Sequence, residues 1–75
     1  MAEQQIRTDV TGRVWKILRT PGEAVAEGET ILIVEAMKME IPVAAEAAGR
    51  LLRLLVTEED EVAEDAVVAV VEVGA

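Results

Sequence analysis

Side chains that could carry covalent or acid–base chemistry are few in this 75-residue chain. The sequence contains no His, Ser, Cys, Tyr or Asn, which removes the usual general base at neutral pH and the usual acyl-transfer nucleophiles. A catalytic site would have to be built from Thr, Lys, Arg, Asp and Glu alone. Without cysteine, neither a disulfide nor a thiolate zinc site can form. We therefore expect neither catalytic residues nor a metal centre.

The segment VEAMKMEIPV, residues 34–43, places one of only two lysines between two methionines near the middle of the chain. All residues from 35 to 40 are good helix formers, whereas the flanking ILIV and IPV are rich in β-branched residues. The segment is therefore either a short helix or a turn that carries an exposed side chain. On spacing alone, the ordinary interpretation is that Lys38 is a solvated turn lysine and that Met37 and Met39 fill gaps in the core.

The composition indicates one small domain with an aliphatic core, in which Trp15 is the only aromatic residue. A domain of this size buries only about 60% of the surface that its unfolded chain exposes. The net charge of −8 and the lack of a basic stripe argue against a nucleic-acid partner. The chain shows no signal-peptide pattern and no apolar run long enough to cross a membrane. We expect a soluble, cytoplasmic domain with no membrane partner.

An internal repeat relates the two halves of the chain at a shift of 37 residues. The segment GRVWKILRT (12–20) aligns with GRLLRLLVT (49–57), and ILIVE (31–35) aligns with VAVVE (68–72). The matching glycines and threonines argue against a chance alignment, because these residues are not abundant here. The two halves should therefore fold as two copies of one structural unit.

Each half is predicted to contain extended segments separated by turns. The segment RLLRLLV could also be an amphipathic helix, but its alignment with the β-rich RVWKILR favours a strand. Neither half could bury its apolar face alone, so the two must pack together. The sequence predicts a flattened all-β barrel or sandwich with a pseudo-twofold axis. The expected strands are residues 6–10, 13–19, 30–35, 41–49, 50–56 and 66–73.

The positions of the glycines predict where the backbone turns sharply or adopts a positive φ. Gly12 is expected to permit a turn or a bulge. In the second half, Glu59 and Asp65 replace Gly22 and Gly28. If those turns need a positive φ, Asp tolerates it moderately and Glu poorly. We expect a looser and locally less stable loop there.

The repeat places MKME, residues 37–40, at the join between the two units, because position 36 aligns with position 73. Two antiparallel strands joined by so few residues need a hairpin, with its tip near Met37 and Lys38. Neither residue favours a positive φ, which predicts a type I turn rather than a primed one. By the pseudo-symmetry, Lys38 should project into solvent at the end opposite to the chain termini.

The segment EAMKME (35–40) resembles the attachment motif of biotinyl domains, the carrier modules of biotin-dependent carboxylases. The resemblance extends over residues 6–73, with residues 1–5 as a short tail, and includes GRVWKIL, PGEAVAEGETILIVEAMKME and AAGRLLRLL. It implies a flattened barrel of two four-stranded antiparallel sheets, with the modified lysine on an exposed hairpin. The small size is similar to that of stand-alone biotin/lipoyl attachment proteins.

Carried over onto this sequence, the resemblance implies that Lys38 bears biotin, attached by a biotin protein ligase. The residues that ligase and carboxylase subunits would recognise are Glu35, Ala36, Met37, Met39 and Glu40. The carrier would move a carboxyl group from a biotin carboxylase to a carboxyltransferase, and would contribute effective concentration rather than catalysis.

Two other functions remain open. A lipoyl carrier of the 2-oxoacid dehydrogenase type would use the same fold and lysine position, with lipoate as the cofactor. Lipoyl domains typically place Asp before the lysine and Ala after it, whereas here both neighbours are Met. The second alternative is an unmodified barrel with a structural or assembly role, in which Lys38 would serve only solubility.

Overall fold

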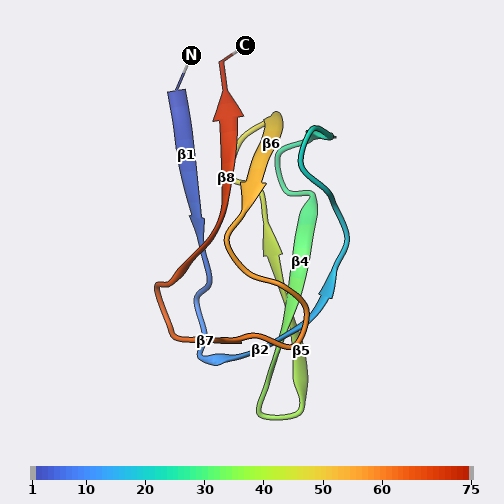
Figure 1. Cartoon of the computed structure of the whole chain (residues 1–75), viewed down its shortest axis with the longest axis vertical. Helices are drawn as coiled ribbons and strands as arrows, with labels where there is room; N and C mark the ends of the chain where they lie inside the picture. The colour runs from blue at the N-terminus through green and yellow to red at the C-terminus, as the bar shows by residue number, and fades with distance from the viewer. Residues whose placement is uncertain (1, 75) are drawn as a thin grey trace.

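Residues 2–74, which the computed structural model describes, form eight β-strands in two antiparallel sheets (Figure 1). One sheet has the order β1 (Ala2–Arg7), β8 (Val67–Val73), β6 (Gly49–Leu54) and β3 (Ala24–Val25). The other has the order β5 (Met39–Ala44), β4 (Thr30–Ala36), β2 (Gly12–Ile17) and β7 (Glu61–Val62). Each sheet takes strands from both halves of the chain. The prediction of two four-stranded sheets is confirmed.

The strand pairing follows the sequence repeat. Arg13 lies opposite Glu35 between β2 and β4, and 37 residues later Arg50 lies opposite Glu72 between β6 and β8. The register shifts after Val14 in the first pair and after Leu51 in the second, so both strands carry a bulge at the same place in the repeat. This equivalence confirms the pseudo-twofold relation.

The molecule is elongated, with extents of 37 × 19 × 18 Å. The β4–β5 hairpin lies at one end and both chain termini lie at the other, as Figure 1 shows along its vertical axis. Ala36 pairs with Met39 at the hairpin end, and the equivalent pair at the far end is Val73 with Ala2. The predicted position of the hairpin opposite the termini is confirmed.

No helix in residues 2–74 could span a membrane.

The core between the sheets is aliphatic, and Trp15 does not belong to it. Trp15 is the extra residue of the β2 bulge and is 46% exposed. A bulge residue has no partner opposite it and leaves the in–out alternation of the strand, which explains why the only aromatic ring lies on the surface. The buried hydrophobic residues are Ile6, Val14, Val25, Ile31, Leu32, Val34, Val43, Ala45, Leu51, Val62, Val68, Ala69, Val70 and Val71.

Two local predictions were wrong. Residues 2–5 are not a tail, because they form part of β1 and pair with β8. Gly12 is needed for a close approach rather than for a turn or a bulge, since a Cβ at this position would lie 2.3 Å from the carbonyl oxygen of Glu35 and the bulge of β2 lies at Trp15. Gly49, its repeat equivalent, meets the carbonyl oxygen of Glu72 in the same way. Small residues at both positions let β2 and β6 lie close to their neighbours.

The turns that were expected to need a positive φ do need one in both halves. Gly22 and Gly28 have φ of 96° and 83°, and Glu59 and Asp65 have 77° and 73°. The hydrogen bonding of the second-half turn is not looser. The N–H of Glu59 donates to Val14 at 2.7 Å, and that of Gly22 donates to Leu51 at 2.8 Å. The lower local stability stays a prediction.

Candidate functional site

Lys38 lies at the tip of the β4–β5 hairpin, in a two-residue turn. The turn contains only Met37 and Lys38, between the paired residues Ala36 and Met39. The φ angles of Met37 and Lys38 are 51° and 65°. Two positive values indicate a primed turn, so the predicted type I geometry was wrong. A primed turn matches the right-handed twist of the paired strands, and this match outweighs the poor fit of Met and Lys to a positive φ.

The side chains of the tip project into solvent. Met37 is 94% exposed and Met39 is 62% exposed, so neither fills the core. Lys38 is exposed as well, and among residues 2–74 it takes part in no hydrogen bond or ion pair. A primary amine placed in this way can be reached by the active site of another protein and can be acylated without breaking an existing contact.

Lys16, the other lysine, has a different environment. It lies within β2, next to the bulge, and its Nζ is 5.7 Å from the centroid of the Trp15 ring. A cation above an aromatic face is held there by about 0.5–1 kcal/mol at an exposed site. The Lys16 amine thus lies over an aromatic ring on the side of the barrel, whereas the Lys38 amine lies at its end and makes no hydrogen bond or ion pair among residues 2–74.

The structure brings together the residues that the sequence predicted around Lys38. Glu35 lies opposite Glu40, and Ala36 lies opposite Met39, so the four form the last two cross-strand pairs before the turn. Glu35 and Glu40 are exposed and Ala36 is half-buried. The carboxylates therefore flank the base of the tip and the methionines cover its end.

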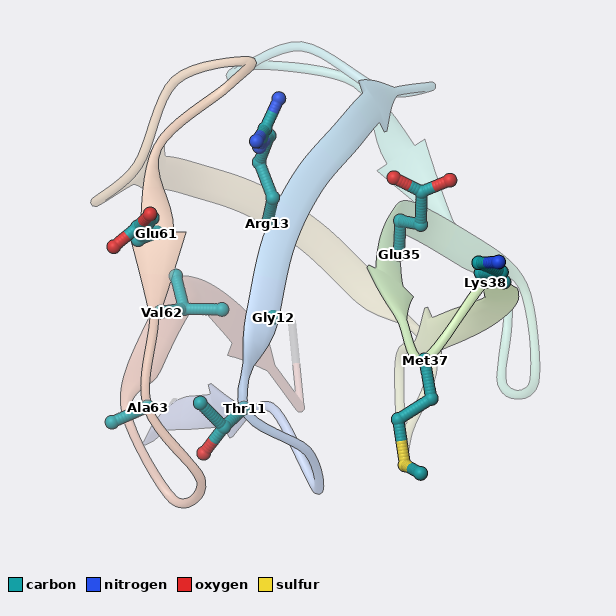
Figure 2. Close-up of a pocket in the computed structure, with 9 residues that line it drawn as sticks. All are labelled: Thr11, Gly12, Arg13, Glu35, Met37, Lys38, Glu61, Val62 and Ala63. Carbon is teal, nitrogen blue, oxygen red and sulfur yellow. The ribbon is translucent and has the colours of Figure 1, made fainter.

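A groove beside the hairpin was not predicted from the sequence. Figure 2 shows it between β2, the segment around β7 and the hairpin, with Met37 and Lys38 extending from the tip in different directions. Its volume is about 640 Å³. The lining residues are Thr11, Gly12, Arg13, Glu35, Met37, Lys38, Glu61, Val62 and Ala63.

A row of charges crosses the sheet along the edge of this groove. Arg13 is the central residue, with Glu35 opposite it on β4 and Glu61 opposite it on β7. Glu40 continues the row on β5. The groove thus presents one guanidinium group between carboxylates, close to the apolar side chains of Val62 and Ala63. Within residues 2–74, no cluster of three acidic side chains is placed to hold a metal ion.

Comparison with known proteins gives a consistent result. A family model described as "Biotin-requiring enzyme" matches residues 3–71. The chain is similar to the biotin/lipoyl attachment protein of Bacillus subtilis, with 34% identity over 59% of this chain and 60% of that protein. It is also similar to the biotinylated protein TB7.3 homolog of Mycobacterium leprae, with 37% identity over 65% of this chain and 68% of that protein.

Two solved structures share the fold. The urea carboxylase of Kluyveromyces lactis matches 96% of this chain with a TM-score of 0.91 and 32% identity, although the match covers only 6% of that enzyme. The lipoyl domain of the 2-oxoglutarate dehydrogenase complex of Azotobacter vinelandii matches 88% of this chain and 84% of that domain, with a TM-score of 0.73 and 30% identity.

Proposed function

The chain belongs to the biotin/lipoyl attachment-domain family, and we propose that it is a biotin carboxyl carrier with biotin attached to the Nζ of Lys38. The observation that carries this proposal is the exposed Lys38 at the tip of a two-residue turn, between two exposed methionines and with no hydrogen-bond or ion-pair partner among residues 2–74. The Met-Lys-Met sequence favours biotin over lipoate, and so does the likeness to a protein named as biotinylated.

The residues present fit an amide-linked cofactor. The Lys38 amine forms no ion pair with the described part of the chain, so it breaks no such contact when acylation removes its charge, and its four-carbon stem becomes part of a long tether. When bound, biotin supplies a ring nitrogen that accepts and releases a carboxyl group. The chain itself contributes position: the hairpin holds Lys38 at one end of an elongated barrel, clear of the sheets.

We further propose that the partners are a biotin protein ligase, a biotin carboxylase and a carboxyltransferase. Likeness to urea carboxylase and to the gamma subunit of methylmalonyl-CoA decarboxylase from Veillonella parvula supports carboxylase-type partners. The carrier would raise the effective concentration of biotin at each active site, while the partners supply the catalytic groups. Glu35, Ala36, Met37, Met39 and Glu40 would form the surface that these partners recognise.

The test is the intact mass of the protein after incubation with a biotin protein ligase, ATP and biotin. The wild-type protein should gain the mass of one biotinyl group. Lys38→Arg should gain none and keep the same melting temperature, because a substitution at an exposed turn position usually changes stability by less than about 0.5 kcal/mol. Lys16→Arg, the matched control, should be labelled at the wild-type rate. Labelling of Lys38→Arg would overturn the assignment.

A lipoyl carrier is the second candidate, favoured by the similarity to a lipoyl domain over most of its length. Parallel incubation with a lipoate protein ligase, ATP and lipoate distinguishes the two. We expect biotinylation to be much faster than lipoylation. The reverse order would favour the lipoyl function, and no modification by either ligase or in the native host would favour an unmodified barrel.

A further inference from the structure

The groove beside the hairpin has the polarity of a site for a small, uncharged molecule that is part apolar and part hydrogen-bonding. Met37 and Ala63 supply exposed apolar surface, and Val62, which is only 7% exposed, adds little to it. Arg13 supplies hydrogen-bond donors, and the Glu61 carboxylate opposite it supplies acceptors. The volume of about 640 Å³ lies within the range of about 300–1,000 Å³ typical of small-molecule sites.

The biotinyl group has complementary chemistry. Its valeryl chain and thioether ring are apolar, and its ureido ring has one carbonyl oxygen and two N–H groups. The carbonyl could accept a hydrogen bond from Arg13, and an N–H could donate one to Glu61. Hydrogen bonds to charged groups of this kind are about twice as strong as neutral ones.

Lys38 is one of the residues that line the groove, so a group attached to its Nζ starts within reach of the site. On the premise of the proposed function, we propose that this groove holds the biotinyl group of the same chain between transfer steps. A short flexible tether gives an effective concentration in the millimolar range. A site with an intrinsic dissociation constant of about 1 mM would then be occupied roughly half of the time.

The pseudo-symmetry supplies a matched control region. At the far end of the barrel, Gly49 and Arg50 are the repeat equivalents of Gly12 and Arg13, and Ala26 is the equivalent of Ala63. The strands there are arranged in the same way, but the termini replace the hairpin and no lysine is near. A biotinyl group tethered to Lys38 can reach the groove beside it. The same group cannot reach the far end, because the barrel is 37 Å long.

The experiment compares amide NMR spectra of the protein before and after biotinylation, with the intact mass showing that one biotinyl group is present. We expect shift changes at Thr11, Gly12 and residues 61–63 several times larger than those at Gly49 and Arg50. Changes confined to residues 36–40 would overturn the groove proposal and leave the biotin carrier function standing. Absence of the biotinyl mass would overturn the carrier function and, with it, the occupant of the groove.

Two variants test the contacts in the biotinylated protein. Ala63→Gln fills part of the groove with a longer side chain, and Ala26→Gln makes the same change at the far end. Both positions are exposed, so both proteins should fold. Ala63→Gln should remove most of the shift change at Thr11, and Ala26→Gln should leave it unaltered. Arg13→Ala should reduce it at least twofold. Wild-type shift changes in both Ala63→Gln and Arg13→Ala would overturn the proposal.

Discussion

Glu35 lies directly opposite Glu40 across the β4–β5 hairpin, in the second cross-strand pair from the turn that carries Lys38. Like charges in this position destabilise a sheet, so the pair is not explained by its local energetics. The repeat provides a comparison, because Glu72 lies opposite Glu3 at the other end of the barrel. Each end of the barrel thus has one pair of opposing glutamates. Only the pair at the hairpin end lies near Lys38.

Neutralising one acid at each end separates recognition from stability. Glu35→Gln should change the free energy of unfolding by at most about 0.5 kcal/mol, since the surface contacts that it removes, with Glu40 and with Arg13, have opposite signs. It should also change the rate of biotinylation if a ligase recognises this carboxylate. Glu72→Gln should have a similarly small effect on stability and none on the rate. A ligase time course and a thermal melt for each variant check this, and equal rates in both would remove Glu35 from the recognition surface.

The distance between the termini and Lys38 predicts tolerance to fusion. Ala2 lies opposite Val73 at the end far from the hairpin. Fusing a globular domain to either terminus through a flexible linker should change the ligase rate less than twofold. The unfused protein is the control, and the melting temperature shows that the barrel is intact. A fusion that folds normally but blocks labelling would mean that ligase contacts extend along the whole barrel.

The repeat was the most informative feature of the sequence for the fold. A shift of 37 residues predicted the pseudo-twofold axis, the hairpin between the halves and the position of its tip. The short strands β3 and β7 were not predicted, because two-residue strands within turn-rich segments have no periodicity of their own. The groove was missed for a related reason: the pairing of β2 with β7 brings Arg13 and Glu61 together from distant parts of the chain.

The errors in the sequence analysis occurred where tertiary structure outweighed residue preference. Met37 and Lys38 adopt positive φ because strand twist selects a primed turn. Trp15 is exposed because a bulge removes it from the alternation that buries its neighbours. Gly12 is needed because a carbonyl oxygen of β4 leaves no space for a Cβ. None of these conditions can be read from residue types alone.

The turns with positive φ in the second half predict stabilising glycine substitutions. Steric strain at a positive φ costs a residue with a Cβ about 1–2 kcal/mol of folding free energy. Glycine has no such strain, and its extra loss of backbone entropy on folding costs a smaller amount of about 0.5–1 kcal/mol. Glu59→Gly should therefore stabilise the protein by roughly 0.5–1 kcal/mol, raising Tm by several degrees. Asp65→Gly should stabilise it less, because Asp tolerates positive φ better than Glu. Urea unfolding measures both changes.

Glu64→Gly is the matched control for these two variants. Glu64 lies next to Asp65 but does not have a positive φ. Glycine there only increases the entropy of the unfolded chain, so the variant should be less stable than the wild type by roughly 0.5–1 kcal/mol. Stabilisation of all three variants alike would show that charge removal is the cause, since each substitution removes one carboxylate.

The first-half turns predict a loss of stability in acid. Hydrogen bonds from the Thr20 N–H and hydroxyl lower the pKa of Glu23 below its ordinary value of 4.5. The Ala26 N–H and the Arg19 guanidinium lower the pKa of Glu29 likewise. A carboxyl group whose pKa is lower in the folded state than in the unfolded state stabilises the fold at pH values above its unfolded-state pKa. This stabilisation is lost as the pH falls through the folded-state pKa. Stability should therefore decline below about pH 4.5.

Comparison of variants isolates this contribution. Glu23→Gln should be less stable than the wild type at pH 7, and the difference in Tm should shrink as pH falls below the ordinary carboxyl pKa of 4.5. Glu27→Gln, which removes an exposed carboxylate without removing any hydrogen bond found within residues 2–74, is the control for net charge. A difference for Glu23→Gln that stays constant from pH 7 to pH 3 would contradict the role of its ionised form.

Exposure of both methionines at the tip predicts that they matter for recognition and not for stability. Met37→Ala should change the free energy of unfolding by less than about 0.5 kcal/mol, as ordinary surface substitutions do. Met39→Ala should cost slightly more, because Met39 begins β5 and is 62% exposed where Met37 is 94% exposed. Both should slow biotinylation if ligase contacts the thioether side chains.

Two reference variants give this last comparison a scale. Leu32→Ala truncates a fully buried residue and should cost about 2–5 kcal/mol, whereas Leu55→Ala truncates an apolar residue that is 51% exposed and lies outside the strands. If the methionines are recognition residues, their melts should resemble that of Leu55→Ala, and their ligase time courses should be slower than its time course. Melts close to that of Leu32→Ala with unchanged labelling would instead assign the methionines to packing, because a side chain that a partner contacts must affect the rate at which Lys38 is modified.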